Sequence, residues 1–218
     1  MEKIISLFKR DYEGTRQIYD EIVEGAEWVV NGEGVATVKW DGTSCKVDGG
    51  KLYARYDAKQ LPTQPSPDGR SLPKVTTPKA PPEGFVPAQD PDPVTGHWPG
   101  WVLVQDQPQY KWHREAWESG CDSADEQLKD GQTYELCGPN VGGNPEGFNK
   151  HVLIPHGNIQ MLDCPRDFDG IKEYLATRDI EGIVWHHPDG RMVKIKAKDF
   201  GISRALPTKP PTEEDADA

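Results

Sequence analysis

Apolar and polar residues alternate in several short stretches of this chain, with a period of two that is typical of β-strands. Glycine, proline and aspartate separate these stretches, and they are the residues that favour turns. The pattern predicts strands at residues 34–38, 44–47, 51–56, 101–104, 132–137, 151–155, 158–162, 180–185 and 192–196. We therefore expect a chain that is rich in short strands.

Two stretches show helical spacing instead. In residues 13–25 the apolar side chains Ile18, Ile22 and Val23 recur at helical intervals, and Gly25 follows as a stop signal. This pattern predicts one amphipathic helix that packs on the body of the protein. A second helix is predicted at residues 168–177.

Residues 61–100 are rich in proline, which neither a helix interior nor a central strand tolerates. Long loops of this kind are usually functional or disordered. One alternative is a proline-rich ligand for an adaptor domain. The interleaved aromatic residues Phe85, Trp98 and Trp101 instead favour a loop that packs on the domain. Beyond this loop, a short or irregular helical segment is predicted around Tyr110, Trp112 and Trp117.

A chain of 218 residues is long enough for a sizeable core. We expect one domain over residues 1–204, with residues 61–100 as an insert and residues 205–218 as a disordered acidic tail. No apolar run is long enough to span a bilayer, and the first residues lack the apolar region of a signal peptide. The protein is therefore expected to be soluble, cytoplasmic and monomeric, with no membrane partner.

The formal net charge is −11, which argues against a non-specific nucleic-acid coat, although an acidic body can still carry a local basic cleft. The cysteines are Cys45, Cys121, Cys137 and Cys164, and none of them has Cys-x-x-Cys spacing. The sequence thus indicates neither a zinc site nor a disulfide framework, and reduced, mostly buried cysteines are expected.

The candidate chemistry begins at Lys39, which follows an alternating strand and precedes the tight turn Asp41-Gly42. A lysine that is buried or flanked by cations loses its proton more readily than in water, and it can then act as a nucleophile. Taken alone, a lysine in an exposed hairpin is the more ordinary interpretation.

Further charged residues follow Lys39 in a fixed order along the chain. A strand carboxylate, Glu135, comes first, then Glu181 directly before an apolar strand, and finally Lys194 and Lys196 on one face of the last strand. Arg55 lies in the strand after the Lys39 hairpin, where a strand arginine is more often solvated than functional. Each residue has an ordinary explanation by itself, but the ordered set is informative.

Four segments carry a resemblance to a known superfamily: Lys39-Trp40-Asp41-Gly42, Tyr134-Glu135-Leu136-Cys137-Gly138, Glu181-Gly182-Ile183-Val184 and Val193-Lys194-Ile195-Lys196. In this order they resemble motifs of the covalent nucleotidyltransferases, which include ATP-dependent ligases and mRNA-capping enzymes. Within that superfamily the chain is most similar to the vertebrate-type 5′-3′ RNA ligase family. The additional matches are residues 96–102 with Tyr110 and Trp112, 143–145, 153–157 and 181–186.

The resemblance implies a mechanism in which Lys39 attacks the α-phosphate of ATP and forms a lysyl-AMP. Lys194 and Lys196 would neutralise the phosphate charge and depress the pKa of Lys39. Glu181 would hold Mg²⁺ or Mn²⁺. The remaining candidate nucleotide-binding residues are Val38, Asp41 and Gly42 beside the nucleophile, Arg55 on phosphate, Glu135 on the ribose, and Ile159 and Ile183 on the adenine.

The resemblance also implies a fold and a substrate. The fold would be an α+β nucleotidyltransferase domain of antiparallel sheets flanked by helices, and too little chain follows the last strand for a C-terminal OB-fold. The substrate would be RNA with 5′-phosphate and 3′-hydroxyl ends. Two alternatives remain: a ligase for nicked DNA or another end-adenylylating enzyme, and an inactive nucleotidyltransferase fold that binds partners through the proline-rich loop.

Overall fold

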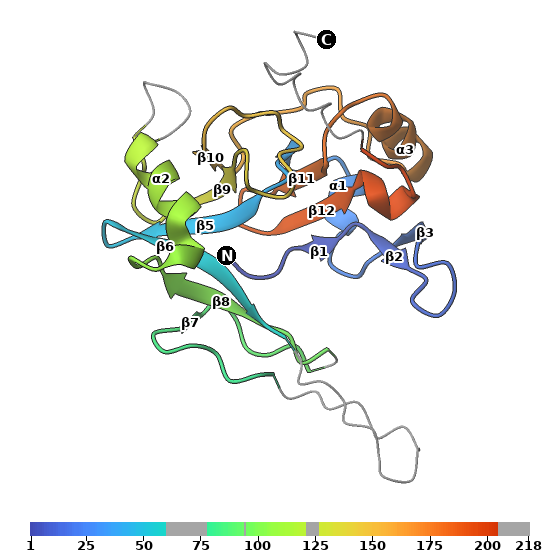
Figure 1. The fold of residues 1–218 in the computed structure, drawn as a ribbon. Coiled ribbons are helices and arrows are strands. Elements are labelled where there is room, and N and C mark those ends of the chain that lie inside the picture. Colours follow the sequence, from blue (N-terminus) through green and yellow to red (C-terminus); the bar gives the residue numbers. More distant parts are fainter. Residues whose placement is uncertain (60–77, 94, 121–126, 205–218) are drawn as a thin grey trace, which may run out of the picture. The chain divides into compact units, whose positions relative to one another are not determined.

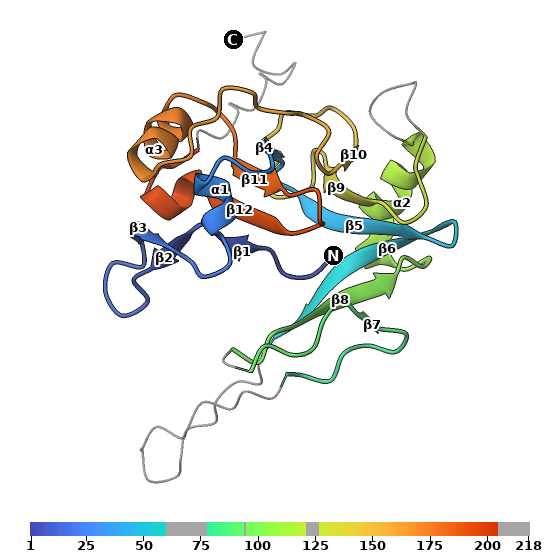
Figure 2. The same cartoon turned by 180° about the vertical axis from the view of Figure 1, so that it is seen from behind.

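The computed structural model describes residues 1–59, 78–93, 95–120 and 127–204. Figures 1 and 2 show the helices and strands from two opposite sides. Their bounds are β1 (Ile5–Ser6), β2 (Phe8–Arg10), β3 (Ile18–Ile22), α1 (Glu27–Val30), β4 (Val35–Lys39), β5 (Thr43–Asp48), β6 (Lys51–Ala58), β7 (Val86–Pro87), β8 (Trp98–Leu103), η1 (Pro108–Tyr110), α2 (Lys111–Ser119), β9 (Thr133–Cys137), β10 (Val152–Pro155), α3 (Phe168–Ala176), β11 (Gly182–His186), β12 (Met192–Lys196) and η2 (Ala197–Phe200).

The fold is α+β, with mostly antiparallel sheets and few helices, as the sequence predicts. Residues 61–77 and 94 of the proline-rich insert, Cys121 and the acidic tail at 205–218 lie outside the described residues. Within the described ranges, no helix is both long enough and apolar enough to cross a membrane.

The described part of the chain forms two compact units, and each unit is assembled from separate segments of sequence. Unit 1 contains Met1–Ile4, Thr43–Leu136 and Val152–Pro155. Unit 2 contains Ile5–Gly42, Cys137–His151 and the chain from residue 156 onward. The single domain expected over residues 1–204 stays a prediction.

The sheet of unit 2 has four strands among the described residues, in the order β1-β12-β11-β4. β11 is central and antiparallel to both β12 and β4. The first strand of the chain, β1, pairs in parallel with β12 at the opposite edge from β4. Strands from the two ends of the sequence thus lie side by side in this sheet.

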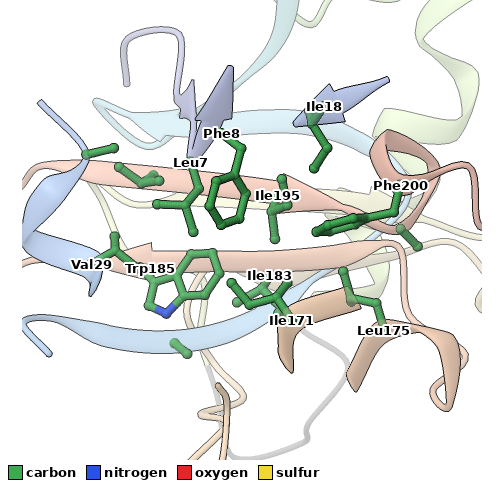
Figure 3. Packing of buried hydrophobic residues seen from close by; sticks show 14 of the residues in the cluster. Leu7, Phe8, Ile18, Val29, Ile171, Leu175, Ile183, Trp185, Ile195 and Phe200 are labelled. Carbon is green, nitrogen blue, oxygen red and sulfur yellow. The ribbon is translucent and has the colours of Figure 1, made fainter. Parts of the chain in front are cut away.

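The core of unit 2 covers one face of this sheet (Figure 3). Ile183 and Trp185 of β11 and Ile195 of β12 point into it and are fully buried, because alternate residues of a strand face the same side. Helix α3 adds Ile171 and Leu175, which are likewise buried. The opposite face of the same strands carries Lys39, Lys194 and Lys196, so the core supports the candidate site from behind.

Three phenylalanine rings pack against one another in the unit 2 core. Phe8 and Phe168 stack edge to face with centroids 4.9 Å apart, and Phe168 and Phe200 do so at 5.1 Å. These contacts join β2, α3 and η2, the short helix that follows the lysine strand. Edge-to-face pairs of this kind are worth about 0.5–1.5 kcal/mol beyond the area that they bury.

Unit 1 is built on a sheet with the order β10-β9-β5-β6-β8-β7 in the described chain. In the proline-rich stretch, the Phe85 ring stacks edge to face on Trp98 at 5.0 Å and on Tyr56 at 6.0 Å. Gly100 permits this packing, since a Cβ there would overlap the Phe85 ring. For its described part, the prediction of a packed loop is therefore confirmed.

The predicted helix at residues 13–25 is wrong, because this segment contains β3. β3 pairs with β2, with Phe8 opposite Ile22 and Arg10 opposite Ile18. Residues four positions apart share a face in both a helix and a strand, so the spacing of Ile18 and Ile22 fits either structure. The hydrogen-bonding partner, β2, decides between them.

The predicted strand at residues 158–162 is also not a regular strand. It is an extended segment beside β4, with an isolated bridge between Thr37 and Gln160. The backbone N–H of Val38 donates to the Ile159 carbonyl at 3.0 Å, and that of Met161 donates to the Ala36 carbonyl at 2.8 Å. The segment therefore protects the open edge of the strand that carries Lys39.

Candidate active site

Lys39 and Lys196 occupy corresponding positions on the two strands that flank β11. Gly182 pairs with Lys39 on one side and with Lys196 on the other. Directly paired residues project from the same face of a sheet, and strands lie about 4.8 Å apart. The two lysine side chains thus rise from the same face about 10 Å apart at their bases, with no side chain between them.

The carboxylate of Glu181 joins these two lysines. One of its oxygens pairs with the Lys39 amine, and the other pairs with the Lys196 amine. The Lys39 amine also donates to the carbonyl of Trp40 at 3.2 Å. Burial by itself raises the pKa of the Glu181 carboxyl, but the charges of Lys39 and Lys196 outweigh it, and the net pKa is lowered.

Lys194 lies two residues before Lys196 on β12, so both side chains face the same side of the sheet and Ile195 faces the other. Burial first, and then the charges of Lys196 and Lys39, lower the pKa of the Lys194 amine to about 8, against the opposing effect of Glu181. Lys194 therefore gives up its proton far more easily than a lysine in water.

The turn after Lys39 is held by Glu146. Its side chain accepts a hydrogen bond from the backbone N–H of Asp41 at 2.9 Å. Burial and the nearby Glu181 raise the pKa of the Asp41 carboxyl, although Lys39 and Lys196 oppose this shift. Asp41 and Glu181 also line a pocket of about 290 Å³ whose other wall is the chain after β12.

Two of the predicted nucleotide-binding residues, Ile183 and Val38, face away from the lysines. Ile183 is fully buried in the core, on the face of β11 opposite to Lys39. Val38 pairs with Ile183 and so faces the same side. Ile159 is 43% exposed, and its backbone bonds the edge of β4. The structure does not bring the Ile183 side chain to the lysine face.

Arg55 and Glu135 belong to unit 1, on β6 and β9. Arg55 lies over the Trp101 ring at 5.0 Å, bonds the Met1 carbonyl at 2.8 Å and pairs with Asp57 at 3.3 Å. Glu135 is buried and stands opposite Ser44 in the sheet. Unit 2 by itself brings together Lys39, Asp41, Gly42, Glu181, Lys194 and Lys196.

This arrangement is suited to a polyanion. Three amines lie on one sheet face around a single carboxylate, so the cluster carries net positive charge on an otherwise acidic protein. Lysines act on phosphates as compact point charges. A local basic cluster, which the acidic net charge left open, is therefore present in unit 2.

Comparison with known proteins agrees with this chemistry. A family model described as RNA ligase 1 matches residues 68–210, which is more than half of the chain. The chain belongs to the RNA ligase 1 family. Within the matched range lie Glu135, Glu181, Lys194 and Lys196, whereas Lys39 precedes it.

Individual relatives in the RNA ligase 1 family extend the match. The RNA ligase 1 of Rattus norvegicus is 31% identical over 224 residues, covering 79% of this chain and 69% of that protein. The RNA ligase 1 of Pongo abelii is 32% identical over 169 residues, covering 59% of this chain and 51% of that protein. That of Danio rerio is 36% identical over 135 residues, covering 49% of this chain and 42% of that protein.

In this RNA ligase 1 family member, the sequence interpretation missed several residues around the lysines. Thr37 is buried on the face that carries Lys39, donates to the Val184 carbonyl at 3.1 Å, and contacts His186 Nε2 at 3.1 Å. Alternation along β4 could have placed Thr37 there. Asp199 accepts the Lys196 backbone N–H at 3.0 Å and pairs with Arg10.

Glu146 and Arg204 were also missed by the sequence interpretation. They are far apart in sequence, yet their side chains pair in a bidentate manner, with both N–O distances at 2.8 Å. Neither residue lies in a strand or in a recognisable motif. No local pattern could have predicted their partnership.

Proposed function

We propose that this chain is an ATP-dependent RNA ligase that joins 5′-phosphate and 3′-hydroxyl RNA ends through a lysyl-AMP on Lys39. The observation that carries the proposal is the placement of Lys39 and Lys196 on the two strands that flank β11, with both amines paired to Glu181 directly before β11. The readily deprotonated Lys194 lies beside them. Membership of the RNA ligase 1 family supports RNA as the acceptor.

In the first step, the neutral amine of Lys39 would form a P–N bond to the α-phosphorus of ATP. The bond between that phosphorus and the bridging oxygen breaks, and pyrophosphate leaves with the electron pair. Lys194 and Lys196 would neutralise the charge that develops on the phosphate oxygens. These cations also favour loss of the proton from Lys39, because like charges lower the pKa of an amine.

The ion pair between Lys39 and Glu181 opposes this step. Glu181 stabilises the protonated amine, and its own lowered pKa makes it a weak base. Lys39 must therefore separate from Glu181 before it can attack. We infer that the arrangement in the structure is a resting state, in which the Lys39 amine is protonated and paired with Glu181.

Later steps would transfer AMP to the RNA 5′-phosphate and then displace AMP by the RNA 3′-hydroxyl. In this proposal, Arg55 contacts phosphate, because a guanidinium binds phosphate in a bidentate manner. Glu135 accepts hydrogen bonds from the ribose hydroxyls.

A divalent cation fits the donor set. Mg²⁺ is usually bound through one or two carboxylates together with substrate phosphates, and the same oxygen ligands suit Mn²⁺. Glu181 and the neighbouring Asp41 would supply those carboxylates, whereas the described residues contain no cluster of three acidic, histidine or cysteine ligands. When bound, the ion would shield phosphate charge. A chelator should therefore stop AMP transfer, and added Mg²⁺ or Mn²⁺ should restore it.

Intact-protein mass after incubation with ATP and Mg²⁺ tests the first step. A gain of one AMP is expected in the native chain, with no gain in Lys39→Ala. Peptide mapping must place the AMP on Lys39, since the pKa of Lys194, about 8, makes it the rival nucleophile. AMP mapped to Lys194 would show that the nucleophile is assigned to the wrong strand.

Matched RNA and DNA nicks separate the proposed RNA ligase from a DNA nick ligase or another end-adenylylating enzyme. Sealing of RNA nicks at a higher rate than DNA nicks supports the proposal, and the reverse order favours the alternative. A chain that gains no mass with ATP, GTP or NAD⁺ would instead be an inactive relative that binds partners.

A further inference from the structure

The Asp41 turn and the segment before Glu181 are joined through two side chains. Glu146 accepts the Asp41 backbone N–H at 2.9 Å, and both Glu146 oxygens bind the guanidinium of Arg204 at 2.8 Å. Arg204 then reaches Asp179, donating from Nε to the carboxylate at 2.7 Å and from a terminal nitrogen to the carbonyl at 3.0 Å. The Glu146 and Arg204 side chains are 9% and 12% exposed.

This series of contacts runs parallel to the Lys39–Glu181 ion pair. Asp41 lies two residues after Lys39, and Asp179 lies two residues before Glu181. Arg204 and Glu146 therefore fix the backbone on both sides of the reacting amine and its carboxylate.

The position of these contacts has a structural reason. The ladder between β4 and β11 ends at the pair of Lys39 with Gly182. A partly buried bidentate carboxylate–guanidinium pair has a defined geometry, so it can take over where the sheet stops.

We propose that Glu146 and Arg204 are positioning residues that set the geometry of Lys39 and Glu181, so that the chain through Arg204 is part of the catalytic apparatus. The proposal rests on the adenylyl transfer proposed above. Neither side chain needs to touch the nucleotide. Displacing a reacting group by about 1 Å can cost about 100-fold in rate, so even a small shift of the turn would be visible.

Single-turnover formation of the covalent AMP adduct tests the role of both residues. Arg204→Gln and Glu146→Ala should lower the rate at saturating ATP by about 10- to 100-fold, with little change in the ATP concentration for half-saturation. The double variant should be no slower than the slower single variant, because both residues act through one series of contacts. Thermal unfolding of each variant is measured alongside.

Arg191→Gln is the matched control. Arg191 also lies in unit 2, and its Nε pairs with Asp189 at 2.7 Å, away from Lys39 in the sheet register. This control should keep the adenylylation rate within about twofold of the native chain, as is usual for exposed substitutions. If Arg204→Gln also stays within that range, the proposal is overturned.

A second readout does not depend on ligase activity. Labelling of Lys39 by acetic anhydride across a pH series, located by peptide mass, reports how firmly Glu181 holds the amine. Loosening the turn in Arg204→Gln should weaken the contact between Lys39 and Glu181 and raise labelling near pH 8 by about threefold. Should the native chain form no AMP adduct, the proposed function fails and this readout decides alone: raised labelling supports positioning, and unchanged labelling overturns it.

Discussion

Lys39 and Lys196 stand opposite each other across β11, both in register with Gly182. The central strand separates their backbones, yet the two amines meet at the two oxygens of one carboxylate, Glu181. The glycine makes this possible, since any side chain at position 182 would stand between the lysines.

Gly182→Ala should therefore harm both stability and function. A Cβ there would overlap the carbonyl of Ile195 and lie 2.8 Å from the Cα of Lys196, and backbone atoms cannot move aside cheaply. We expect a loss of about 1–3 kcal/mol in the free energy of unfolding, the usual cost of overpacking, measured by urea denaturation. Gly190→Ala provides the contrast in open space, although its positive φ of 94° adds some strain. A Gly182→Ala chain as stable and active as the native one would contradict the described strand spacing.

Glu181→Gln should reduce stability at neutral pH and have less effect in acid. The pKa of Glu181 is lowered on folding, so its contribution is present above the unfolded value of 4.5 and is lost as the pH falls through the folded value. The free energy of unfolding of the variant should be lower by about 1–3 kcal/mol near pH 7, and this difference from the native chain should shrink below about pH 4.5. Denaturant titrations at a series of pH values check this.

Glu173→Gln, on the exposed side of α3, is the control for that series. Equal pH dependence in the two variants would mean that the Lys39 and Lys196 charges do not act on Glu181 as described.

Lys194→Met should stabilise the protein at neutral pH. The folded pKa of about 8 lies below the ordinary value of 10.5, so the folded state disfavours the charged amine throughout the range below pH 8. That penalty is relieved as the pH rises from about 8 to about 10.5, where the unfolded chain binds more protons. The variant should thus gain up to about 3 kcal/mol near pH 7, and this gain should vanish in alkali.

Adenylylation of Lys194→Met should nevertheless fall, because a cation near the phosphate is lost. Lys172→Met on the exposed side of α3 controls for the general effect of removing a lysine. A Lys194→Met chain that is less stable than the native one near pH 7 would show that the charged Lys194 amine does not destabilise the folded state.

Strands with one buried face were predictable from the sequence. β4 and β12 each overlap a predicted strand, because Ala36 and Ile195 alternate with polar or exposed positions, and β11 overlaps a predicted apolar strand. The order of charged residues along these strands then led to the lysine cluster. The association of Lys39, Glu181 and Lys196 in one site was implied by the resemblance to covalent nucleotidyltransferases. In the structure, the antiparallel pairing of β11 with β4 and β12 brings these residues together.

Features that depend on distant partners were not predictable. β3 has the same apolar spacing as a helix, and its identity follows from pairing with β2. Ile183 has a suitable apolar side chain for an adenine, but its position on β11 turns it toward the core. The pairing of Glu146 with Arg204 spans 58 residues and has no local signature.

Truncation after Arg204 should leave AMP transfer essentially intact, whereas truncation after Ile202 should reduce it about as strongly as Arg204→Gln, by about 10- to 100-fold. The reason is that Arg204, rather than the acidic residues beyond it, bonds Glu146 and Asp179. Mass spectrometry of the two shortened chains after incubation with ATP measures the difference. A large loss of AMP transfer on removing residues 205–218 would reveal a role for the acidic residues.

The parallel pair of β1 with β12 has a consequence for synthesis on the ribosome. Ser6 pairs with Lys194, and the Leu7 N–H bonds the Lys194 carbonyl at 2.9 Å, so β1 has no strand partner in the described chain until β12, almost 190 residues later, has been synthesised. A nascent chain has Lys39 long before it has Lys196. The growing polypeptide should therefore form no lysyl-AMP, and the amine cluster should assemble only when translation of the described region is nearly complete.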